Sequence, residues 1–402
     1  MPPKNYNVST FISNGSYGCV YRKPLECKED SINMKYGNPN YMMKLMDKYS
    51  AEIELKYGRL LKSVDPLQQY FLYVLPHLCT VKQPLSSLKT DCTILKSMED
   101  PKGYIMKYGG ITLNEYIEDD RSDRINITLI WNWFNKMIKA LVLLRIINMI
   151  HFDIKEDNLV IDENGDIFII DFGLSTIGDH IPSHNTFYGV EPLFINMQHI
   201  SNKKAYKDAK EQYHDQDFDN AYRLLHSVYV KGKKTYDKFI SPFVKEIDVF
   251  SVGRVFSNIM DIFEHRFNRQ DKKLTLLLRN IVEKMVLTDP TKQATLDQVT
   301  RYIESRTSEL KLTELPITIA RSREEKKRAL KDLCEVKKVT IPEEDVIVYH
   351  DEKDNLYLCY TEDEIATIIP YYKINKTEGR SRFFDKLDRC ITRVDRGDTE
   401  RA

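Results

Sequence analysis

The chain has few of the features that mark a secreted, disulfide-built or zinc-binding protein. It contains only seven cysteines in 402 residues, and this number is odd. None of them forms a C-x-x-C pair, so the usual spacing of zinc ligands is missing. We therefore expect reduced thiols, as in a cytosolic protein, rather than a disulfide framework. The cysteines stand at positions 19, 27, 79, 92, 334, 359 and 390.

The sequence also lacks an excess of either charge and any long apolar run. Lysine plus arginine and aspartate plus glutamate each number 60, so the formal net charge is zero. This balance gives no support for a nucleic-acid or membrane partner. The longest apolar stretch, Met137–Ile150, is interrupted by polar residues and is too short to span a membrane, so it predicts a buried helix. The N-terminus has no apolar segment typical of a secretory signal, and we expect a cytoplasmic protein.

The remaining composition is typical of a globular protein, with 42% hydrophobic and 30% charged residues. The length allows two or three domains. Strands followed by one helix indicate a small β-rich unit that ends near Tyr108, and Ser50 can cap the helix. The predicted strands are 8–22, 41–46, 69–80 and 103–107, the helix is 50–63, and a polar segment, Lys23–Asn40, separates the first two strands.

Beyond Gly109-Gly110 the pattern favours helices. Thr128 can cap a long helix that reaches about Ile150. The last quarter, from about Arg306, is either a small added module or a tail packed on the body, and the sequence leaves both open. Further predicted helices are Phe218–Tyr229, 246–264, 274–287 and a solvated Ser322–Val339, and a hairpin is predicted from Val346–His350 and Leu356–Tyr360.

Residues 151–173, HFDIKEDNLVIDENGDIFIIDFG, carry most of the candidate chemistry. The Asn-Gly turn between two apolar runs predicts a hairpin of Leu159–Ile161 and Ile167–Ile170. This hairpin would bring Asn158 and Asp171 to the same end, where their oxygens can hold Mg²⁺ together with a phosphate-bearing substrate. Beside them, Asp153 can accept a proton and Lys155 can face negative charge. The combination predicts phosphoryl transfer.

This segment resembles the catalytic core of eukaryotic-type protein kinases. The resemblance implies that Asp153 accepts the proton of the substrate hydroxyl and that Lys155 faces the γ-phosphate of ATP. Asn158 and Asp171 match the two metal-holding positions. Lys155, two residues after the aspartate, resembles the pattern of serine/threonine kinases. ATP and Mg²⁺ are the implied cofactors, and a protein substrate is the implied partner.

A second resemblance to this family lies at residues 13–20, SNGSYGCV. The family pattern is G-x-G-x-x-G-x-V, and Ser13 stands in place of the first glycine. Gly15 and Gly18 would allow the backbone to approach phosphates, because no Cβ intervenes. The loop precedes a strand that carries the lysine expected to neutralise the α- and β-phosphates. That lysine is Lys44, with Lys48 as a rival, and its helical partner is Glu54, with Glu52 as the alternative.

Residues 104–110, YIMKYGG, resemble the hinge between the two kinase lobes. Met106 would gate the pocket behind adenine, and the backbone of Lys107–Tyr108 would hydrogen-bond the base. Val20 and Leu159 would enclose the adenine ring from opposite lobes. These residues complete the expected ATP site.

Downstream, Asp248-Val-Phe-Ser-Val-Gly253 resembles the kinase D-x-W-S-x-G helix, in which the aspartate accepts N–H bonds from the catalytic loop. Two departures concern how the activation segment is held. Gln293 replaces the arginine of the late D-P-x-x-R-x-T motif, and Val190-Glu191-Pro192 stands where A-P-E is expected. Phe152 replaces the arginine that usually precedes the catalytic aspartate and meets an activation-loop phosphate, so switching by phosphorylation at that loop is not expected.

The sequence therefore predicts an α+β, bilobal protein-kinase-like fold with a β-rich N-lobe and a helical C-lobe. The expected parts are an N-lobe of residues 1–108, a C-lobe of 109–305 with an insertion at 197–245, and an extension of unknown role at 306–402. The insertion and composition most resemble serine/threonine kinases of large cytoplasmic DNA viruses, which would place the protein in host cytoplasm or virion. The expected activity is ATP-dependent serine/threonine phosphorylation. Two alternatives are an ATP-binding pseudokinase and a small-molecule kinase of the aminoglycoside or choline type; Lys155 and the intact Asp171-Phe172-Gly173 argue against the second.

Overall fold

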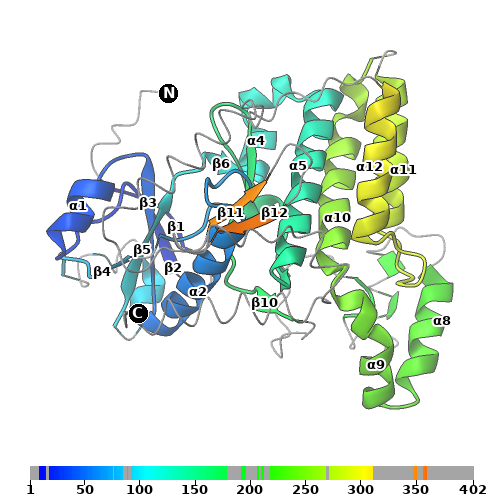
Figure 1. Cartoon of the computed structure of the whole chain (residues 1–402), viewed down its shortest axis with the longest axis horizontal. Helices are drawn as coiled ribbons and strands as arrows, with labels where there is room; N and C mark the ends of the chain where they lie inside the picture. The colour runs from blue at the N-terminus through cyan, green and yellow to red at the C-terminus, as the bar shows by residue number, and fades with distance from the viewer. Residues whose placement is uncertain are drawn as a thin grey trace. The chain divides into compact units, whose positions relative to one another are not determined.

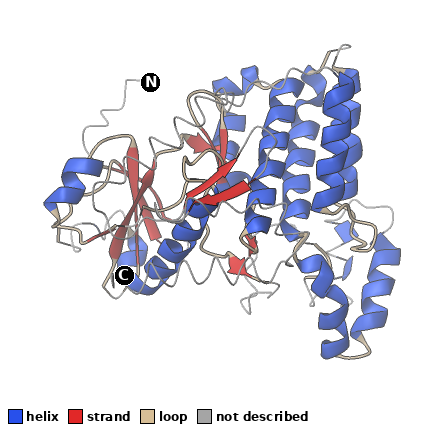
Figure 2. Cartoon of the chain, in the orientation of Figure 1, coloured by secondary structure: helices blue, strands red, loops and turns tan. Residues whose placement is uncertain are grey.

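The computed structural model describes most of residues 9–310 and two short strands beyond them (Figure 2). The chain divides into two compact units, one of Met1–Arg59 with Gln68–Leu310 and one of Leu60–Leu67 with Lys311–Ala402. The described residues are 9–14, 18–75, 77–84, 88, 92–96, 98, 100–178, 192–195, 206–207, 210–211, 218–268, 271–310, 347–350 and 356–359.

The N-terminal region is built on a five-stranded sheet with the order β1-β2-β3-β5-β4 (Figure 1). Lys44 of β3 lies opposite Val20 of β2 and Tyr104 of β5 in antiparallel register. Side chains alternate between the faces of a strand, so Lys44 points away from the apolar core cluster that contains its neighbours Met43 and Leu45. The strands are β1 (Thr10–Asn14), β2 (Gly18–Arg22), β3 (Tyr41–Met46), β4 (Leu78–Cys79) and β5 (Lys102–Lys107).

The helices of this region depart from the predicted bounds. The segment between the first strands contains a short helix, α1 (Asp30–Tyr36), which buries Ile32 and Tyr36. Helix α2 (Lys48–Val64) begins two residues earlier than predicted, because Asp47 rather than Ser50 caps it. The Asp47 carboxylate accepts the Ser50 backbone N–H at 2.9 Å and the Ser50 hydroxyl at 2.6 Å.

The predicted strand at 69–80 is wrong over most of its length. Of the described residues in this segment, only Leu78–Cys79 joins the five-stranded sheet. Residues 70–72 instead follow a strand of the helical region, since Ile169 N donates to Tyr70 O at 2.9 Å and Leu72 N donates to Ile169 O at 3.0 Å. An apolar run cannot show on its own which neighbour its backbone will pair with.

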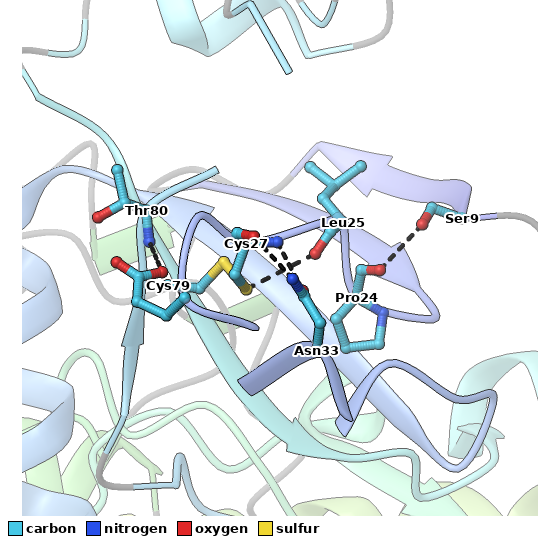
Figure 3. The surroundings of a disulfide bond; sticks show 8 residues. Ser9, Pro24, Leu25, Cys27, Asn33, Cys79 and Thr80 are labelled. Carbon is cyan, nitrogen blue, oxygen red and sulfur yellow. Dashed lines mark hydrogen bonds between the residues drawn. A yellow bond between two sulfur atoms is a disulfide. The ribbon is translucent and has the colours of Figure 1, made fainter. Parts of the chain in front are cut away.

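The prediction of reduced thiols is also wrong for four of the cysteines. Disulfides join Cys19 to Cys92 and Cys27 to Cys79, with Cα atoms 5.8 and 5.3 Å apart. The partners are 73 and 52 residues apart in sequence, so only tertiary folding brings them together. Around the second bond, the Asn33 side chain accepts from Cys27 N and donates to Cys27 O, both at 2.7 Å (Figure 3). These four cysteines therefore no longer support the expectation of a cytosolic protein.

Reduction of these disulfides should lower the stability of the N-terminal sheet. Each bond closes a long loop, for which a stabilisation of about 2–4 kcal/mol is typical. We expect the melting temperature of the wild type to fall by several degrees when dithiothreitol is added. Dithiothreitol should not change the melting temperature of the variant in which all four cysteines are replaced, Cys19→Ser/Cys92→Ser/Cys27→Ser/Cys79→Ser. Alkylation and mass spectrometry of the unreduced protein check the pairing, and four freely alkylated cysteines at these positions would contradict it.

The helical region begins after the short strand β6 (Ile111–Thr112), and long helices make up most of it (Figure 1). Helix α5 is capped by Asn126, whose side chain accepts Leu129 N at 2.9 Å, and not by the predicted Thr128. It ends at Ile146, and residues 149–150 form a strand instead of continuing the helix. The helices are α4 (Leu113–Glu118), α5 (Ile127–Ile146), α8 (Phe218–Tyr229), α9 (Lys233–Val244), α10 (Ile247–Phe263), α11 (Lys272–Met285) and α12 (Leu296–Leu310), with 3₁₀ turns at Asp120–Arg124, Glu156–Asn158 and Glu264–Arg266. A further 3₁₀ turn, Thr93–Lys96, lies in the N-terminal region.

Helix α5 begins ten residues before the predicted apolar stretch, and by length and composition alone it could cross a membrane. Its surroundings are nevertheless those of a core helix. Trp133 Nε1 donates to Gly165 O at 2.7 Å, and the ring of Phe134 meets that of Phe256 of α10 edge-on at 5.2 Å. The prediction of a buried helix is confirmed.

The predicted helices at 218–229, 246–264 and 274–287 are confirmed with small changes at their ends. Three further helices of this region, α4, α9 and α12, were not predicted. Helix α9 is rich in lysine and contains Pro242, which obscures its apolar face, although Tyr236, Ile240 and Val244 are buried. Helices α8 and α9 lie side by side as a helical hairpin near the N-terminal end of α10 (Figure 1).

Two predicted hairpins are confirmed. Strand β8 pairs with β9 in antiparallel register, and β6 joins them as a third strand. In the second unit, β11 pairs with β12 in the same manner. The predicted helix at 322–339 lies outside the described residues. These strands are β6 (Ile111–Thr112), β7 (Met149–Ile150), β8 (Leu159–Ile161), β9 (Ile167–Ile169), β10 (Thr176–Ile177), β11 (Ile347–His350) and β12 (Leu356–Cys359), and β7 pairs with β10.

Candidate active site

The β8–β9 hairpin places Asn158 and Asp171 at the same end. Ile170 N donates to Asn158 O at 3.0 Å, so the residue before Asp171 is joined directly to Asn158. Asn158 is 6% exposed and closes a network with Asp153. Its Nδ2 donates at 2.7 Å both to the backbone oxygen of Asp153 and to Asp153 Oδ2. The site therefore begins as one hydrogen-bonded unit of catalytic-loop and hairpin residues.

Asp153 and Lys155 form the second part of this unit. Lys155 Nζ lies 3.0 Å from Asp153 Oδ1 and 2.9 Å from Oδ2. On the other side, Asp153 N donates to His151 Nδ1 at 3.2 Å, which leaves His151 Nε2–H to donate to Ile170 O at 3.0 Å. The Asp153 carboxylate thus has a fixed orientation, with a lysine and an amide as its partners.

The backbone of this loop is unusual. Phe152 and Asp171 have positive φ values of 66° and 61°. Aspartate adopts this conformation more readily than phenylalanine, for which it is a genuine outlier. Such a residue costs about 1–3 kcal/mol and persists only when its surroundings impose it. The strain therefore marks two constrained positions, one directly before Asp153 and the other directly before Phe172.

Asp248 is one source of that constraint. Its carboxylate accepts His151 N at 2.7 Å and Phe152 N at 3.0 Å, which confirms the expected contact between the Asp248 helix and the catalytic loop. Asp248 is 5% exposed, and desolvation by burial raises the pKa of its carboxyl group, although His151 and these N–H groups act to lower that pKa. Asp248 lies at the start of α10 and so fixes the loop to the core of the helical region.

Lys44 joins the sheet to this site. Its Nζ lies 2.9 Å from Glu54 Oε1 of α2 and 2.8 Å from Asp171 Oδ1. Burial alone would lower the pKa of Lys44, but the charges of Asp171 and Glu54 outweigh it and raise that pKa. Desolvation raises the pKa of Glu54, whereas for Asp171 the charge of Lys44 overcomes desolvation and lowers the pKa. Lys44 is therefore a permanent cation between two carboxylates.

The rival residues lie elsewhere. Lys48 Nζ is 3.9 Å from Glu52 Oε1, and both side chains are more than half exposed. These two residues form a surface pair one helical turn apart on α2. The structure brings Lys44 and Glu54, rather than Lys48 and Glu52, to Asp171.

The glycine-rich loop is only partly described. Ser13 lies opposite Val20 in the β1–β2 ladder and is exposed, whereas Gly15 lies outside the described residues. Gly18 lies against β3, and a Cβ added there would be 2.6 Å from Leu45 O. Gly18 is thus required for the close approach of two strands, independently of any phosphate.

Apolar residues form a small cluster beside the hinge segment. Leu72, Met106 and Val160 are its buried members, and Met42 and Ile170 pack against it. Leu159 is fully buried but is not part of this cluster, because adjacent residues of β8 point to opposite faces. Sequence reasoning missed Val160 and Met42. The strand alternation, counted from Asn158 and from Lys44, is the signal that could have found them.

The hinge differs from expectation at Tyr108. Its N–H donates to Asn40 O at 2.8 Å, so this N–H is not available to a bound base. The guanidinium of Arg22 lies over the Tyr108 ring, 3.9 Å from its centre. Asn40 and Arg22, the two partners of Tyr108, belong to the β-rich region that precedes the hinge in sequence. The spacing of the hinge residues does not indicate these contacts.

The helical region is held by an ion pair that the resemblance does not imply. The Glu246 carboxylate, with a 6% exposed side chain, binds Arg145 Nη2 at 3.0 Å and Nη1 at 3.3 Å and accepts Leu296 N at 2.9 Å. Gln293, the departure from the late motif, donates to Glu246 O at 3.3 Å. In the other departure, Val190-Glu191-Pro192 in place of A-P-E, Val190 and Glu191 lie outside the described residues. Arg145 and Glu246 thus join α5, α10 and α12.

Removing Arg145 should destabilise the protein strongly. The Arg145→Ala change leaves the buried Glu246 carboxylate without its cation, for which a loss of about 3–5 kcal/mol is typical. The matched control is Arg279→Ala, since Arg279 pairs with Asp261 and Glu264, both more than half exposed. That change should cost about 0–1 kcal/mol. Urea unfolding measures both, and equal losses would contradict the role given to Arg145.

Among the described residues, one other group could hold a metal ion: Cys27, Glu29 and Cys79. Its two sulfur atoms are joined in a disulfide, so they are not thiolate ligands. The oxygen donors at Asn158 and Asp171 remain the site for a hard cation.

Comparison with known protein families agrees with this geometry. Residues 85–208 match the family model for the protein kinase domain, which covers less than a third of the chain. The match includes Asp153, Lys155, Asn158 and Asp171, and it does not reach back to Lys44.

Several curated proteins are similar to the chain. It is 24% identical over 208 residues to CBL-interacting serine/threonine-protein kinase 19 of Arabidopsis thaliana, covering 46% of this chain and 42% of the relative. It is 30% identical over 112 residues to CBL-interacting serine/threonine-protein kinase 12 of the same plant, covering 27% and 22%. With serine/threonine-protein kinase VHS1 of Saccharomyces cerevisiae it shares 26% identity over 204 residues, 44% of each chain.

The chain spans less than half the length of each of these relatives. Residues 85–208 are thus similar to the protein kinase domain, with homology to serine/threonine kinases, and such a domain implies the bilobal kinase fold. The sheet-rich N-terminal region and the helical region that follows it agree with that fold.

Proposed function

We propose that this chain is a serine/threonine protein kinase that transfers the γ-phosphoryl group of ATP to protein hydroxyl groups. One observation carries the proposal: Lys44 Nζ reaches both Glu54 and Asp171, at the hairpin end where Asn158 holds Asp153. Phosphoryl transfer depends mostly on positioning and on the neutralisation of phosphate charge. A lysine with two carboxylates beside an oriented aspartate supplies both requirements.

The donor set of the site fits Mg²⁺, which prefers oxygen ligands. Asn158 directs its Nδ2 to Asp153, which leaves its Oδ1 as the metal-facing atom. Asp171 Oδ1 is bound to Lys44, which leaves Oδ2. When bound, the metal would neutralise charge on the ATP phosphates, and these two residues would hold it.

The chain's own residues then have separate tasks. Asp153 would accept the proton of the substrate hydroxyl, and its contacts with Lys155 and Asn158 orient the carboxylate for this step. Lys155 would face the γ-phosphate, and Lys44 would hold the α- and β-phosphates while Glu54 fixes its position. Ser13, Gly15 and Gly18 would cover the phosphates. The proposed adenine pocket combines Val20, Met106, the carbonyl side of Tyr108 and Val160. Val160 takes the place proposed for Leu159, whose side chain points to the opposite face of β8.

The proposal is tested by incubating the purified full chain with γ-labelled ATP, Mg²⁺ and a generic basic protein. We expect labelled protein in the presence of Mg²⁺ and none when EDTA is added. Labelling that continues in EDTA, or no labelling with any divalent metal, would overturn the proposal.

A second candidate is an ATP-binding protein that does not transfer phosphate. The observation that favours it is the use of the Tyr108 N–H by Asn40, which removes one expected contact with the base. Saturable ATP binding with no transfer in the same assay would support this candidate.

The finer resemblance to kinases of large cytoplasmic DNA viruses, with a cytoplasmic location, is also part of the proposal. Its support is the helical insertion and the composition.

A further inference from the structure

The side chain of Phe152 belongs to an apolar cluster that joins four parts of the helical region. We name it the Phe152 cluster. It combines the catalytic loop with residues 193–194, the α8–α9 hairpin and the start of α10. Its buried members are Ile150, Phe152, Leu193, Phe194, Phe218, Leu225, Tyr236, Ile240, Val244, Ile247 and Phe250.

Phe152 occupies a strained position between two site residues. It is 4% exposed and adopts a φ of 66°, directly between His151 and Asp153. Its N–H is bound to Asp248, and its ring is buried in the cluster. A bulky residue keeps this conformation only where its surroundings impose it. The packing around the Phe152 ring is therefore part of what holds Asp153 in place.

The hairpin also holds residues 192–195 by a polar contact. Tyr236 of α9 is fully buried, and its hydroxyl donates to Phe194 O at 2.7 Å. Burial raises the pKa of Tyr236, with the nearby charge of Asp237 adding to it, so the hydroxyl stays protonated and remains a donor. Ile195 N closes a turn onto Pro192 O at 2.9 Å beside this contact. A buried carbonyl that loses its donor is costly, so the contact fixes the backbone at Phe194.

From this geometry we infer that the α8–α9 hairpin is a positioning element of the active site, with Phe152 and Tyr236 as positioning residues for Asp153 and for residues 192–195. The hairpin spans most of the described part of the 197–245 insertion, which has no assigned role in the chemistry. The cluster supplies the constraint on the catalytic loop through packing, so the site is assembled without a charged group at position 152. The consequence for catalysis rests on the proposed kinase function.

The inference is tested first without any assay of activity, by amide hydrogen exchange. The Tyr236→Phe change removes only the hydroxyl that binds Phe194 O. We expect exchange at His151, Phe152 and Ile195 to rise about tenfold, because one buried hydrogen bond is lost from the element that holds them. The matched control is Tyr302→Phe, since the Tyr302 hydroxyl donates to Leu277 O at 3.0 Å between α12 and α11. This control should leave exchange at those three amides unchanged.

Kinetics then separate positioning from general stability. We expect Tyr236→Phe and Leu225→Ala to lower kcat about tenfold while the KM for ATP stays within about twofold, because the phosphate-facing residues are untouched. Phe152→Leu should keep most of the activity that Phe152→Ala loses. Equal effects of Tyr236→Phe and Tyr302→Phe on exchange would overturn the inference. If the wild-type chain transfers no phosphate while the exchange difference persists, the kinase proposal fails and the positioning role of the hairpin stands.

Discussion

Substituting Asp153→Asn should lower phosphoryl transfer by about 10²–10⁴-fold, the range typical of a general base. Asparagine keeps the size of the side chain and can still meet Lys155 or Asn158, but it cannot accept the proton of the substrate hydroxyl. The contacts of Asp153 lie within the loop, so we expect the melting temperature to stay close to that of the wild type. Initial rates at saturating ATP, with circular dichroism of the same preparation, measure both properties.

The matched control for this change is Asp157→Asn, four residues along the same segment. Asp157 is an exposed residue of the short 3₁₀ turn before β8. The control should keep a rate close to the wild type. If Asp153→Asn retained full activity, the role assigned to Asp153 would be wrong.

The Lys44→Met change should have the second largest effect, a loss of about 10²–10³-fold in kcat. Methionine fills similar space but removes the cation that lies 2.9 Å from Glu54 and 2.8 Å from Asp171. The two carboxylates then face each other without a cation, and the phosphates of ATP lose a positive partner. Initial rates over a range of ATP concentrations measure the loss.

Two further variants make this test specific. Lys48→Met removes a lysine that forms only an exposed pair with Glu52, and it should leave the rate within about twofold of the wild type. Glu54→Gln keeps the shape of the helical partner and should lower the rate less than Lys44→Met. Similar losses for Lys44→Met and Lys48→Met would show that the buried position of Lys44 is irrelevant.

The parts of the site that the sequence predicted well are local. The β8–β9 hairpin follows from an Asn-Gly turn between apolar runs, and Gly165 has the positive φ of 85° that such a turn requires. The positions of Asn158 and Asp171 then follow from strand pairing alone. The Asp248 contact was predicted by resemblance, because a short helical motif carries it.

The parts that were missed depend on partners far apart in sequence. Arg145 and Glu246 are separated by 101 residues, and no local pattern marks either as a buried ion. Two cysteine pairs meet only after the sheet and its flanking segments have folded. The hydrogen bond from the Tyr108 amide to Asn40 O was missed for the same reason. The spacing of the hinge residues does not indicate which loop lies beside them.

The central claim is that this site transfers phosphate to serine or threonine. Its most direct test is phosphoamino-acid analysis of a protein substrate labelled by the full chain with γ-labelled ATP and Mg²⁺, run beside Asp153→Asn. We expect phosphoserine or phosphothreonine from the wild type and neither from the variant. Phosphotyrosine alone, or the same products from both proteins, would contradict the account.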